Sequence, residues 1–401
     1  MVGKIPLLHR FFEMAGMIGI TKPGYRMASA GSYCCTIRDI FELDLDDRSM
    51  LDSVFGPTLR NNTKERVIEV NGYDGLSSSE IIFTANSTSQ AIDTVFKALI
   101  EPGDEVFVTV PGWNQFSEWD EDKKEYVGLP HSGTKGKVEI LKLKMEDGWA
   151  YPLEELKEKI SSKTKLIVAQ TPGNNPTGNN FDIKSICEVA EDIGAYVLHD
   201  EIYRGLELDA PYSTPTAVNL YDNAVAVNSF SKTLGLEGLR LGWIASRNEE
   251  LMSKCEDIAF WSKAEQHFFL EIAYHALEPS KYKKLLKEKR KTQKEGWFIV
   301  YQWLNSNSDI FEWVPPEAAY IAFPKFNLKI DSWSLCEKLL NEYNVLVVPG
   351  ICYGFDDHIR IGVGKTTADR VVRGLMQIDK CLETYVRTHR ANEVQHSRNV
   401  D

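Results

Sequence analysis

Cysteine is sparse in this chain of 401 residues: its seven cysteines are scattered and form no C-x-x-C pair. Cys34 and Cys35 are adjacent, an arrangement that suits neither a disulfide framework nor a zinc site. We therefore predict reduced thiols and no metal centre. Reduced thiols are typical of the cytoplasm, which is the expected location.

Long apolar runs are also lacking. No stretch of about 18 uncharged apolar residues occurs, so no membrane-spanning helix is predicted. The segment 1–20 is apolar, but Lys4, His9, Arg10 and Glu13 interrupt the continuous apolar region that a signal peptide needs.

Positive charge is in deficit, since 46 lysines and arginines face 58 acidic residues and the net charge is −12. An acidic surface repels nucleic acids and anionic lipids, so neither is a predicted partner. The motifs G-x-x-x-x-G-K-[ST] and G-x-G-x-x-G are absent, which argues against a nucleotide-binding protein. The remaining composition, 43% hydrophobic and 26% charged, is typical of a globular chain.

Short apolar runs rich in β-branched residues alternate with helix-like segments between residues 79 and 244. Runs of this length and composition fit buried strands of a parallel sheet. We predict strands at 80–85, 105–110, 165–170, 195–200, 224–230 and 241–246. Strand–helix alternation of this kind predicts a doubly wound α/β layer.

The pattern changes after residue 248. A lysine-rich stretch at 280–306 predicts a helix that crosses between two lobes and turns its charged face to solvent. Short strands around one helix at 318–363 predict a smaller α+β unit. We predict an N-terminal arm at 1–45 that contributes to the small domain, a large domain at 46–295 and a small domain at 296–401.

Residues that follow the predicted strands are the candidates for chemistry, because ligands of α/β sheets bind at the carboxyl ends of the strands. Ser87, Thr88 and Ser89 open a helix after the first strand, where their hydroxyls can bind a phosphate or simply cap the helix. Trp113 follows the second strand, where its face can cover a planar ring or fill a gap.

The next strands end in polar groups. Asn175 lies in the turn NNPTG (174–178), a sequence that is also compatible with a bare turn. Asp200 and Tyr203 lie in DEIY (200–203), where an acid is often only a helix cap.

Lys232 and Arg240 lie in SFSKTLGLEGLR (229–240), which follows the fifth strand. Hydrophobic runs on both sides of Lys232 predict desolvation, which lowers the pKa of an amine and frees it to attack a carbonyl. Taken alone, this lysine is better explained by a structural role.

The ordered set of an anion cradle, an aromatic plate and Asn, Asp, Tyr, Lys and Arg side chains meets the needs of pyridoxal phosphate. NNPTG, DEIY and SFSK with its following arginine resemble the class I/II aminotransferases, which are fold type I pyridoxal-phosphate enzymes. The resemblance covers about residues 30–380. It implies a large domain with a mainly parallel sheet flanked by helices, a smaller α+β domain, pyridoxal 5'-phosphate as cofactor, and a homodimer.

The resemblance also implies roles for these residues. Lys232 is expected to form the Schiff base and move the proton, Asp200 to pair with the ring nitrogen, and Asn175 and Tyr203 to bind the ring 3′ oxygen. Lys232, Asp200 and Tyr203 form the expected catalytic set, and Trp113 is expected to lie against the ring. The residues expected to hold the phosphate are Ser87, Thr88, Ser89, Ser229 and Arg240.

The resemblance places Arg360, in HIRIG (358–362), at the substrate's α-carboxylate, which a guanidinium binds with two hydrogen bonds. Gly31 and Asn175 complete the expected substrate site. Two departures stand out. Phe55 falls where many relatives carry a tyrosine that reaches the neighbouring subunit's phosphate, and no second arginine is identifiable as a reader of a side-chain carboxylate.

Transamination from an L-amino acid to a 2-oxo acid, within amino acid metabolism, is the first expectation. An alternative is elimination and cyclisation of a hydroxylated arginine, because the segments 323–326, 334–350 and 359–362 resemble capreomycidine synthases. That reaction needs a carboxylate for the guanidinium, and Glu13 and Glu317 are the candidates. A cofactor-binding regulator without catalysis is disfavoured, because we expect neither a spare domain nor a basic patch and because Lys232 and Asp200 are both in place.

Overall fold

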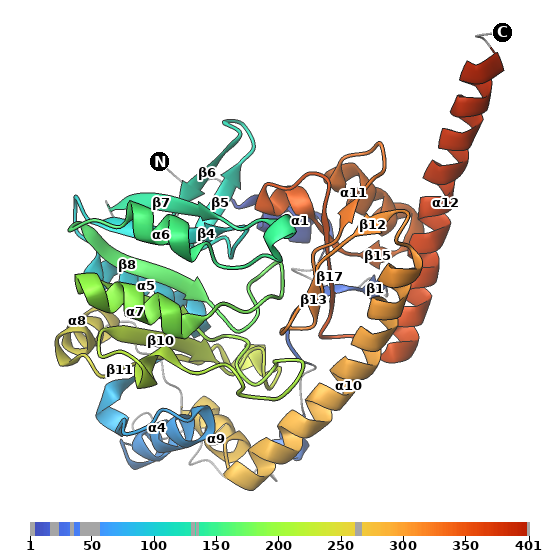
Figure 1. Cartoon of the computed structure of the whole chain (residues 1–401). Helices are drawn as coiled ribbons and strands as arrows, with labels where there is room; N and C mark the ends of the chain where they lie inside the picture. Colours follow the sequence, from blue (N-terminus) through green and yellow to red (C-terminus); the bar gives the residue numbers. More distant parts are fainter. Residues whose placement is uncertain are drawn as a thin grey trace.

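A computed structural model describes seven ranges of the chain: 5–16, 24–32, 36–40, 57–129, 133, 136–260 and 267–398. Figure 1 shows two lobes that are linked by one long diagonal helix. Among the described residues, none of the helices is both long and apolar enough to cross a membrane.

The large lobe is built on a seven-stranded sheet. Its spatial order is β3 (Ile81–Thr84), β11 (Gly242–Ser246), β10 (Ala224–Ser229), β9 (Tyr196–Asp200), β8 (Thr164–Gln170), β4 (Glu105–Val110) and β7 (Lys137–Lys142). Neighbouring strands are parallel, except that β11 is antiparallel to both β10 and β3. The predicted mainly parallel sheet is therefore confirmed.

The strand predicted at 241–246 was expected to be parallel with the others, and that expectation is wrong. β11 is antiparallel because the chain between β10 and β11 contains only a 3-10 turn, η4 (Glu237–Leu239). A parallel neighbour requires a crossover segment, which is usually a helix.

Helices cover both faces of this sheet, as its sequence pattern predicts. Along β8, Leu166 and Val168 pack into one hydrophobic cluster and Ile167 and Ala169 into the other, the two-residue alternation of a strand that is buried on both sides. The first cluster includes α5 (Ser87–Leu99) and α8 (Glu249–Ala259), and the second includes α7 (Ile183–Ile193).

The smaller lobe combines short strands with helices, so its predicted α+β character is confirmed. The long helix α10 (Pro279–Ser306) matches the helix predicted at 280–306 and runs alongside α12 (Ala368–Arg398) (Figure 1). The remaining elements of this lobe are α11 (Ser332–Tyr343), β12 (Phe311–Glu312), β13 (Ile321–Ala322), β14 (Lys325–Phe326), β15 (Val345–Leu346), β16 (Val348–Pro349) and β17 (Ile359–Val363).

The N-terminal segment packs against the smaller lobe. β1 (Tyr25–Arg26) pairs with β15, β2 (Ala28–Ser29) pairs with β17, and the ring of Phe11 on α1 (Leu7–Met14) meets the edge of Trp333. The domain boundaries stay predictions, and the one at 295/296 falls inside α10.

The other helices and strands of the described residues are α2 (Ile37–Ile40), α4 (Pro57–Asn71), α6 (Leu153–Lys159), α9 (His267–Ala276), β5 (Ser117–Asp120) and β6 (Glu125–Gly128).

Candidate active site

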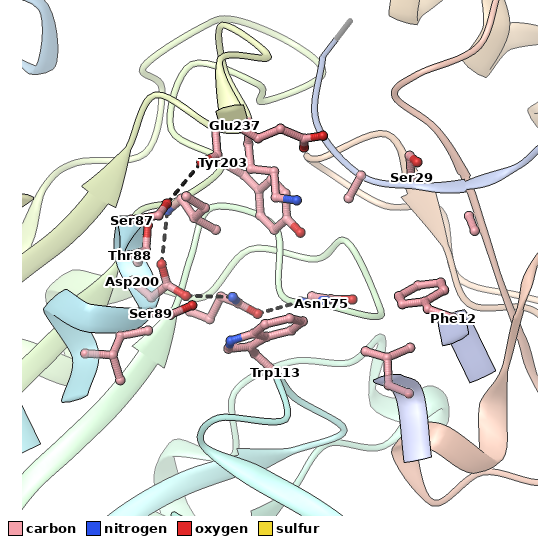
Figure 2. Close-up of a pocket in the computed structure, with 18 of the residues that line it drawn as sticks. Phe12, Ser29, Ser87, Thr88, Ser89, Trp113, Asn175, Asp200, Tyr203 and Glu237 are labelled. Carbon is pink, nitrogen blue, oxygen red and sulfur yellow. Dashed lines mark hydrogen bonds between the residues drawn. The ribbon is translucent and has the colours of Figure 1, made fainter. Parts of the chain in front are cut away.

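A cavity of about 530 Å³ lies at the carboxyl ends of the parallel strands and is lined by residues of both lobes and of α1. Figure 2 shows the hydroxyl residues at the start of α5 beside Asp200 on one side of this cavity, with Phe12 and Ser29 on the opposite side. The predicted site residues that line it are Ser87, Thr88, Ser89, Trp113, Asn175, Asp200, Tyr203, Lys232, Arg240 and Arg360.

Asp200 ends β9 as a buried carboxylate. Burial raises its pKa from 3.8 to about 6, although hydrogen bonds from Gln170 and the Ile202 N–H oppose this rise. The Gln170 Nε2–Asp200 Oδ2 distance is 2.7 Å. A carboxylate in such a place gains when a cation binds beside it, as the protonated nitrogen of a heterocycle does.

Gln170 is a residue that the sequence reasoning missed. It lies opposite Asp200 in the β8–β9 register, and its Oε1 also accepts the Asn175 N–H at 2.8 Å. One side chain thus holds the predicted carboxylate and the predicted asparagine in place. The available signal was a glutamine at the carboxyl end of an otherwise apolar strand.

Lys232 lies in the loop after β10. Burial lowers its pKa from 10.5 to about 8; Lys365, Arg360 and Arg240 lower it further, and Glu237 opposes them. Its amine is therefore easier to deprotonate than that of an ordinary lysine.

Gly31 does not line the cavity, contrary to expectation, because it packs directly on Lys232. A Cβ atom at Gly31 would lie 2.8 Å from Lys232 Cδ, and the residue has φ +99°. The Ser32 N–H donates to the Lys232 carbonyl at 2.7 Å. The residues of this segment that face the cavity are Ala28, Ser29 and Ala30.

The start of α5 and the segment that carries Arg240 form a polar cradle. Ser87 and Arg240 both have left-handed backbone, with φ 60° and 50°, and the Ser87 N–H donates to the Arg240 carbonyl at 2.9 Å. The buried Thr88 Oγ1 has no hydrogen-bond partner in the part of the chain that the structure describes. A helix N-terminus with hydroxyl side chains is an anion site.

Ser229 is not among the residues that line the cavity, and its expected contact with the phosphate stays a prediction. Its side chain is still part of β10 and accepts the Ser231 N–H at 3.3 Å. Ser231, beyond the end of the strand, lines the cavity and lies 3.0 Å from Ser87, hydroxyl to hydroxyl.

Arg360 is held at the other end of the cavity with 4% of its surface exposed. Its guanidinium donates to Asn175 Oδ1 at 2.7 Å, to the Tyr353 hydroxyl at 2.6 Å and to the Ala28 carbonyl at 2.6 Å. Among the described residues its buried Nε has no partner. A fixed guanidinium with an unused donor fits an anionic ligand.

Apolar groups complete the cavity. Leu8 and Phe12 of α1 line it together with Trp113, and burial raises the pKa of Tyr203. Which side of α1 faces the cavity depends on how the N-terminal segment packs against the smaller lobe. Sequence reasoning therefore missed these side chains. The further lining residues that it missed are His9, Ala28, Ser29, Ala30, Ile92, Gln170, Ile202, Ser231, Glu237 and Lys365.

The carboxylates considered for a guanidinium do not enter the cavity. Glu13 is exposed on α1, and the carboxylate of Glu317 accepts the Asn180 N–H at 2.7 Å. Glu237 lines the cavity instead. Phe55 lies outside the described residues.

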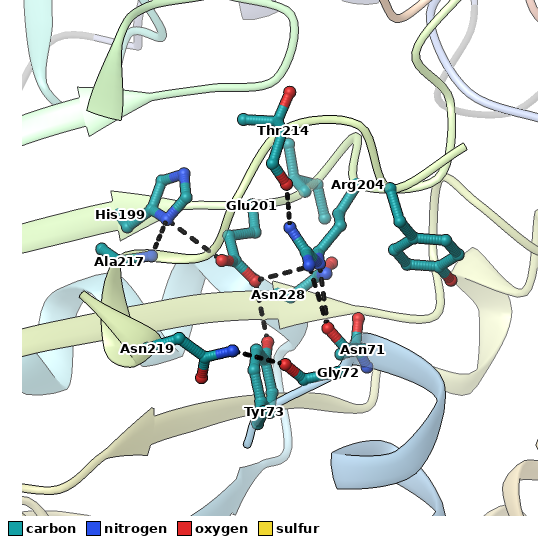
Figure 3. A network of polar contacts seen from close by, with 12 residues as sticks. Asn71, Gly72, Tyr73, His199, Glu201, Arg204, Thr214, Ala217, Asn219 and Asn228 are labelled. Atoms are coloured by element: carbon teal, nitrogen blue, oxygen red, sulfur yellow. Dashed lines mark hydrogen bonds and ion pairs between the residues drawn. The ribbon is translucent and has the colours of Figure 1, made fainter. Parts of the chain in front are cut away.

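A second polar cluster surrounds Glu201, the residue that follows Asp200 in the chain (Figure 3). The buried Glu201 accepts the Tyr73 hydroxyl at 2.9 Å, and its oxygens lie 3.0 Å from His199 Nδ1 and 4.0 Å from Arg204 Nε. Burial raises the pKa of Glu201, but Arg204 and His199 outweigh burial and lower it to about 2. The Arg204 guanidinium also donates to the Asn71 and Thr214 carbonyls.

The cavity fits pyridoxal 5'-phosphate in its donor chemistry. Lys232 supplies the amine, Asp200 a buried anion for the ring nitrogen, and the unpartnered Thr88 hydroxyl a donor for the phosphate. The Arg360 Nε is a further donor without a partner among the described residues, at the other end of the cavity.

Comparison with known proteins agrees with this chemistry. The family model described as aminotransferase class I and II matches residues 50–376. The chain is 30% identical to an aspartate aminotransferase of Pyrococcus horikoshii over 82% of this chain and 81% of that protein. It is 28% identical to the capreomycidine synthase of Streptomyces vinaceus over 91% of each.

A solved structure with this fold is a PLP-dependent aminotransferase of Streptococcus suis. It has a TM-score of 0.82 and 25% identity, and the match covers 96% of this chain and 99% of that chain. The family model spans most of the chain, including both lobes. The chain therefore belongs to the class I and II aminotransferases and is a pyridoxal-phosphate-dependent transferase of fold type I.

Proposed function

We propose that this aminotransferase moves the amino group of an L-amino acid to a 2-oxo acid, with Lys232 as the residue that binds the cofactor and moves the proton. The observation that carries this proposal is the amine of Lys232, whose pKa burial lowers to about 8, in one cavity with Asp200 and Arg360. An amine with this pKa can both accept and return a proton near neutral pH.

Pyridoxal phosphate, when bound, supplies an aldehyde carbon and an electron-withdrawing ring. Asp200 holds the proton on the ring nitrogen, and Gln170 orients the carboxylate for this task. Asn175 and Tyr203 would bind the ring 3′ oxygen, and Trp113 would cover the ring face. Ser87, Thr88, Ser89, Ser231 and Arg240 would bind the phosphate, and the Ser229 hydroxyl accepts the Ser231 N–H.

Arg360 binds the substrate's α-carboxylate. Because Tyr353, Asn175 and the Ala28 carbonyl hold its guanidinium, the carboxylate is bound in one orientation, which presents the α-hydrogen to Lys232. Gly31 packs against the backbone and the stem of the Lys232 side chain and so restricts where this side chain can go.

We also propose a homodimer in the cytoplasm. Assembly as a homodimer is implied by the family resemblance, and a reduced compartment is supported by the five cysteines that the structure describes, all of which are free and buried. Light scattering on the eluted peak of a gel filtration column tests the dimer directly.

Covalent trapping tests the role of Lys232. The cofactor-loaded protein is reduced with borohydride and digested, and the peptide that carries the pyridoxyl group is identified by mass spectrometry. We expect the label on Lys232, its loss in Lys232→Ala with the fold retained, and its persistence in Lys184→Ala, which changes an exposed lysine of α7. A label on another lysine would overturn the assignment.

Isotope transfer tests the reaction. A panel of ¹⁵N-labelled amino acids is incubated with 2-oxo acids, and the products are analysed by mass spectrometry. We expect ¹⁵N in the amino acid that corresponds to the acceptor. Loss of water from the donor without transfer would instead favour elimination.

A further inference from the structure

Two charged side chains of the cavity have no role in the chemistry proposed above. Glu237 and Lys365 both line the cavity and form an ion pair with each other. Glu237 begins η4, five residues after Lys232, whereas Lys365 follows β17 in the smaller lobe. Both act on the Lys232 amine, which Glu237 makes more basic and Lys365 less basic. The pair therefore lies within electrostatic reach of the reacting amine.

The lysine of this pair is the more firmly placed partner. The Gly364 N–H donates to the Ser29 carbonyl at 2.9 Å, and a Cβ atom at Gly364 would lie only 1.8 Å from the Gly31 carbonyl oxygen. The backbone next to Lys365 is thus locked against the arm that covers Lys232. The side chain of Lys365 is 27% exposed and that of Glu237 is 46% exposed, so the carboxylate is the partner that can turn to water.

Such a partly exposed ion pair contributes little net stability, because water screens it and two flexible side chains must be ordered. A ligand carboxylate can therefore replace Glu237 at Lys365 with little loss. A ligand without a second carboxylate leaves the ion pair closed and brings no unpaired charge into the cavity.

The remaining charges of the cavity are already assigned. Arg240 faces the cofactor phosphate, Arg360 the α-carboxylate and Asp200 the ring nitrogen. A reaction that alternates between an amino-acid donor and a 2-oxo-acid acceptor requires one cavity to accommodate two different side chains. Among the described residues that line the cavity there is no further arginine for an acidic side chain, and Lys365 is placed to bind it.

Building on the function proposed above, we propose that Lys365 binds the distal carboxylate of a dicarboxylic 2-oxo-acid acceptor. Glu237 is the counter-charge that holds Lys365 while the side chain in the cavity carries no carboxylate. Lys365 and Glu237 thus determine specificity toward the acceptor and take no part in the proton transfer.

The test compares two acceptors, 2-oxoglutarate and pyruvate, with the same donor, and its readout is the ratio of their kcat/KM values. Loss of a charge-assisted hydrogen bond to a ligand carboxylate lowers affinity roughly tenfold to a hundredfold, so Lys365→Met should lower the ratio by about that factor. Lys365→Arg should retain most of it. Glu237→Gln should raise the ratio, because it removes the anion that competes for Lys365.

The ratio isolates substrate recognition, because any change in the basicity of Lys232 affects both acceptors alike. Lys184→Met, on exposed α7, is the matched control and should leave the ratio unchanged. An equal loss with both acceptors in Lys365→Met would assign the pair to a structural contact between the lobes and overturn the inference. Wild-type enzyme that uses pyruvate but not 2-oxoglutarate would also overturn it, whereas failure to transfer to either acceptor would refute the proposed function itself.

Discussion

Two neighbouring carboxylates at the end of β9 occupy opposite environments. Asp200 faces the cavity and Glu201 lies in the second polar cluster, and both side chains are buried. Burial raises the pKa of Asp200 to about 6. Burial acts on Glu201 in the same direction, but Arg204 and His199 lower its pKa to about 2.

This difference teaches that burial alone does not decide the charge of a carboxylate. Glu201 has its cation and its tyrosine donor inside the protein, so its charge is compensated in the folded chain. Asp200 has a glutamine and one backbone N–H, so its full compensation depends on a ligand. The cluster around Glu201 therefore supports the fold, whereas the charge of Asp200 in the cavity is fully compensated only by a bound cofactor.

The largest expected effect is on stability. Arg204→Met leaves the Glu201 carboxylate buried without its cation, and breaking a buried pair in this way destabilises by about 3–5 kcal/mol. The backbone carbonyl of Arg204, which accepts the Thr233 hydroxyl beside Lys232, is retained. We therefore expect a much lower midpoint of urea unfolding, with turnover per folded molecule close to that of the parent.

The matched control is Arg373→Met. Arg373 pairs with Asp369 at 3.1 Å on the exposed surface of α12, where such a pair contributes at most about 1 kcal/mol. An equal loss of stability in both variants would mean that Glu201 is not compensated by Arg204 as described.

The next effect is on turnover. Asp200→Asn removes the anion from the ring nitrogen, and loss of one preorganised electrostatic partner lowers kcat roughly 10²–10³-fold. Glu201→Gln, one residue later, should reduce stability and leave kcat nearly unchanged. Steady-state kinetics on both cofactor-loaded variants checks this contrast, and reversed effects would mean that the two carboxylates have been assigned to the wrong sides.

The smallest effect concerns the pH dependence of stability in the cofactor-free protein. The pKa of Asp200 rises from 3.8 to about 6 on folding, so the folded form binds its proton more tightly. The free energy of unfolding should therefore fall as the pH rises from about 4 to about 6, by up to about 3 kcal/mol from this group. Urea unfolding at several pH values measures the fall, and Asp200→Asn should abolish it.

Glu201 contributes with the opposite sign. Its pKa falls from 4.5 to about 2 on folding, so its stabilisation is present above about pH 4.5 and is lost as the pH falls toward 2. Glu201→Gln should therefore flatten the acid limb of the same curve. Unchanged acid sensitivity in this variant would show that other groups control acid unfolding.

Much of the site was predictable because it lies where strands end. The positions of Asn175, Asp200 and Lys232 follow from apolar runs and from the rule that ligands bind at the carboxyl edge of the sheet. The structure places Ser231 rather than Ser229 at the cavity, because Ser231 lies beyond the end of β10 whereas Ser229 is still within the strand. Local sequence does not encode where such a strand stops to that accuracy.

Other features depend on contacts between distant segments. The antiparallel direction of β11 follows from a connection without a crossover helix, which an apolar run does not reveal. The packing of Gly31 on Lys232 and the cavity-facing side of α1 arise from the arm meeting the smaller lobe. The roles of these residues in catalysis stay predictions until the variants are measured.

The pairing of β2 with β17 has a consequence for how the molecule is made. Ala28 lies beside Gly362, so the segment around Ala28 must wait until the much later segment around Gly362 has been synthesised before the two can pair. Closing so long a loop is entropically unfavourable until the rest of the chain is compact. The segment that packs over Lys232 should therefore be put in place late in folding. Nascent chains that stop short of β17 should lack a finished catalytic cavity.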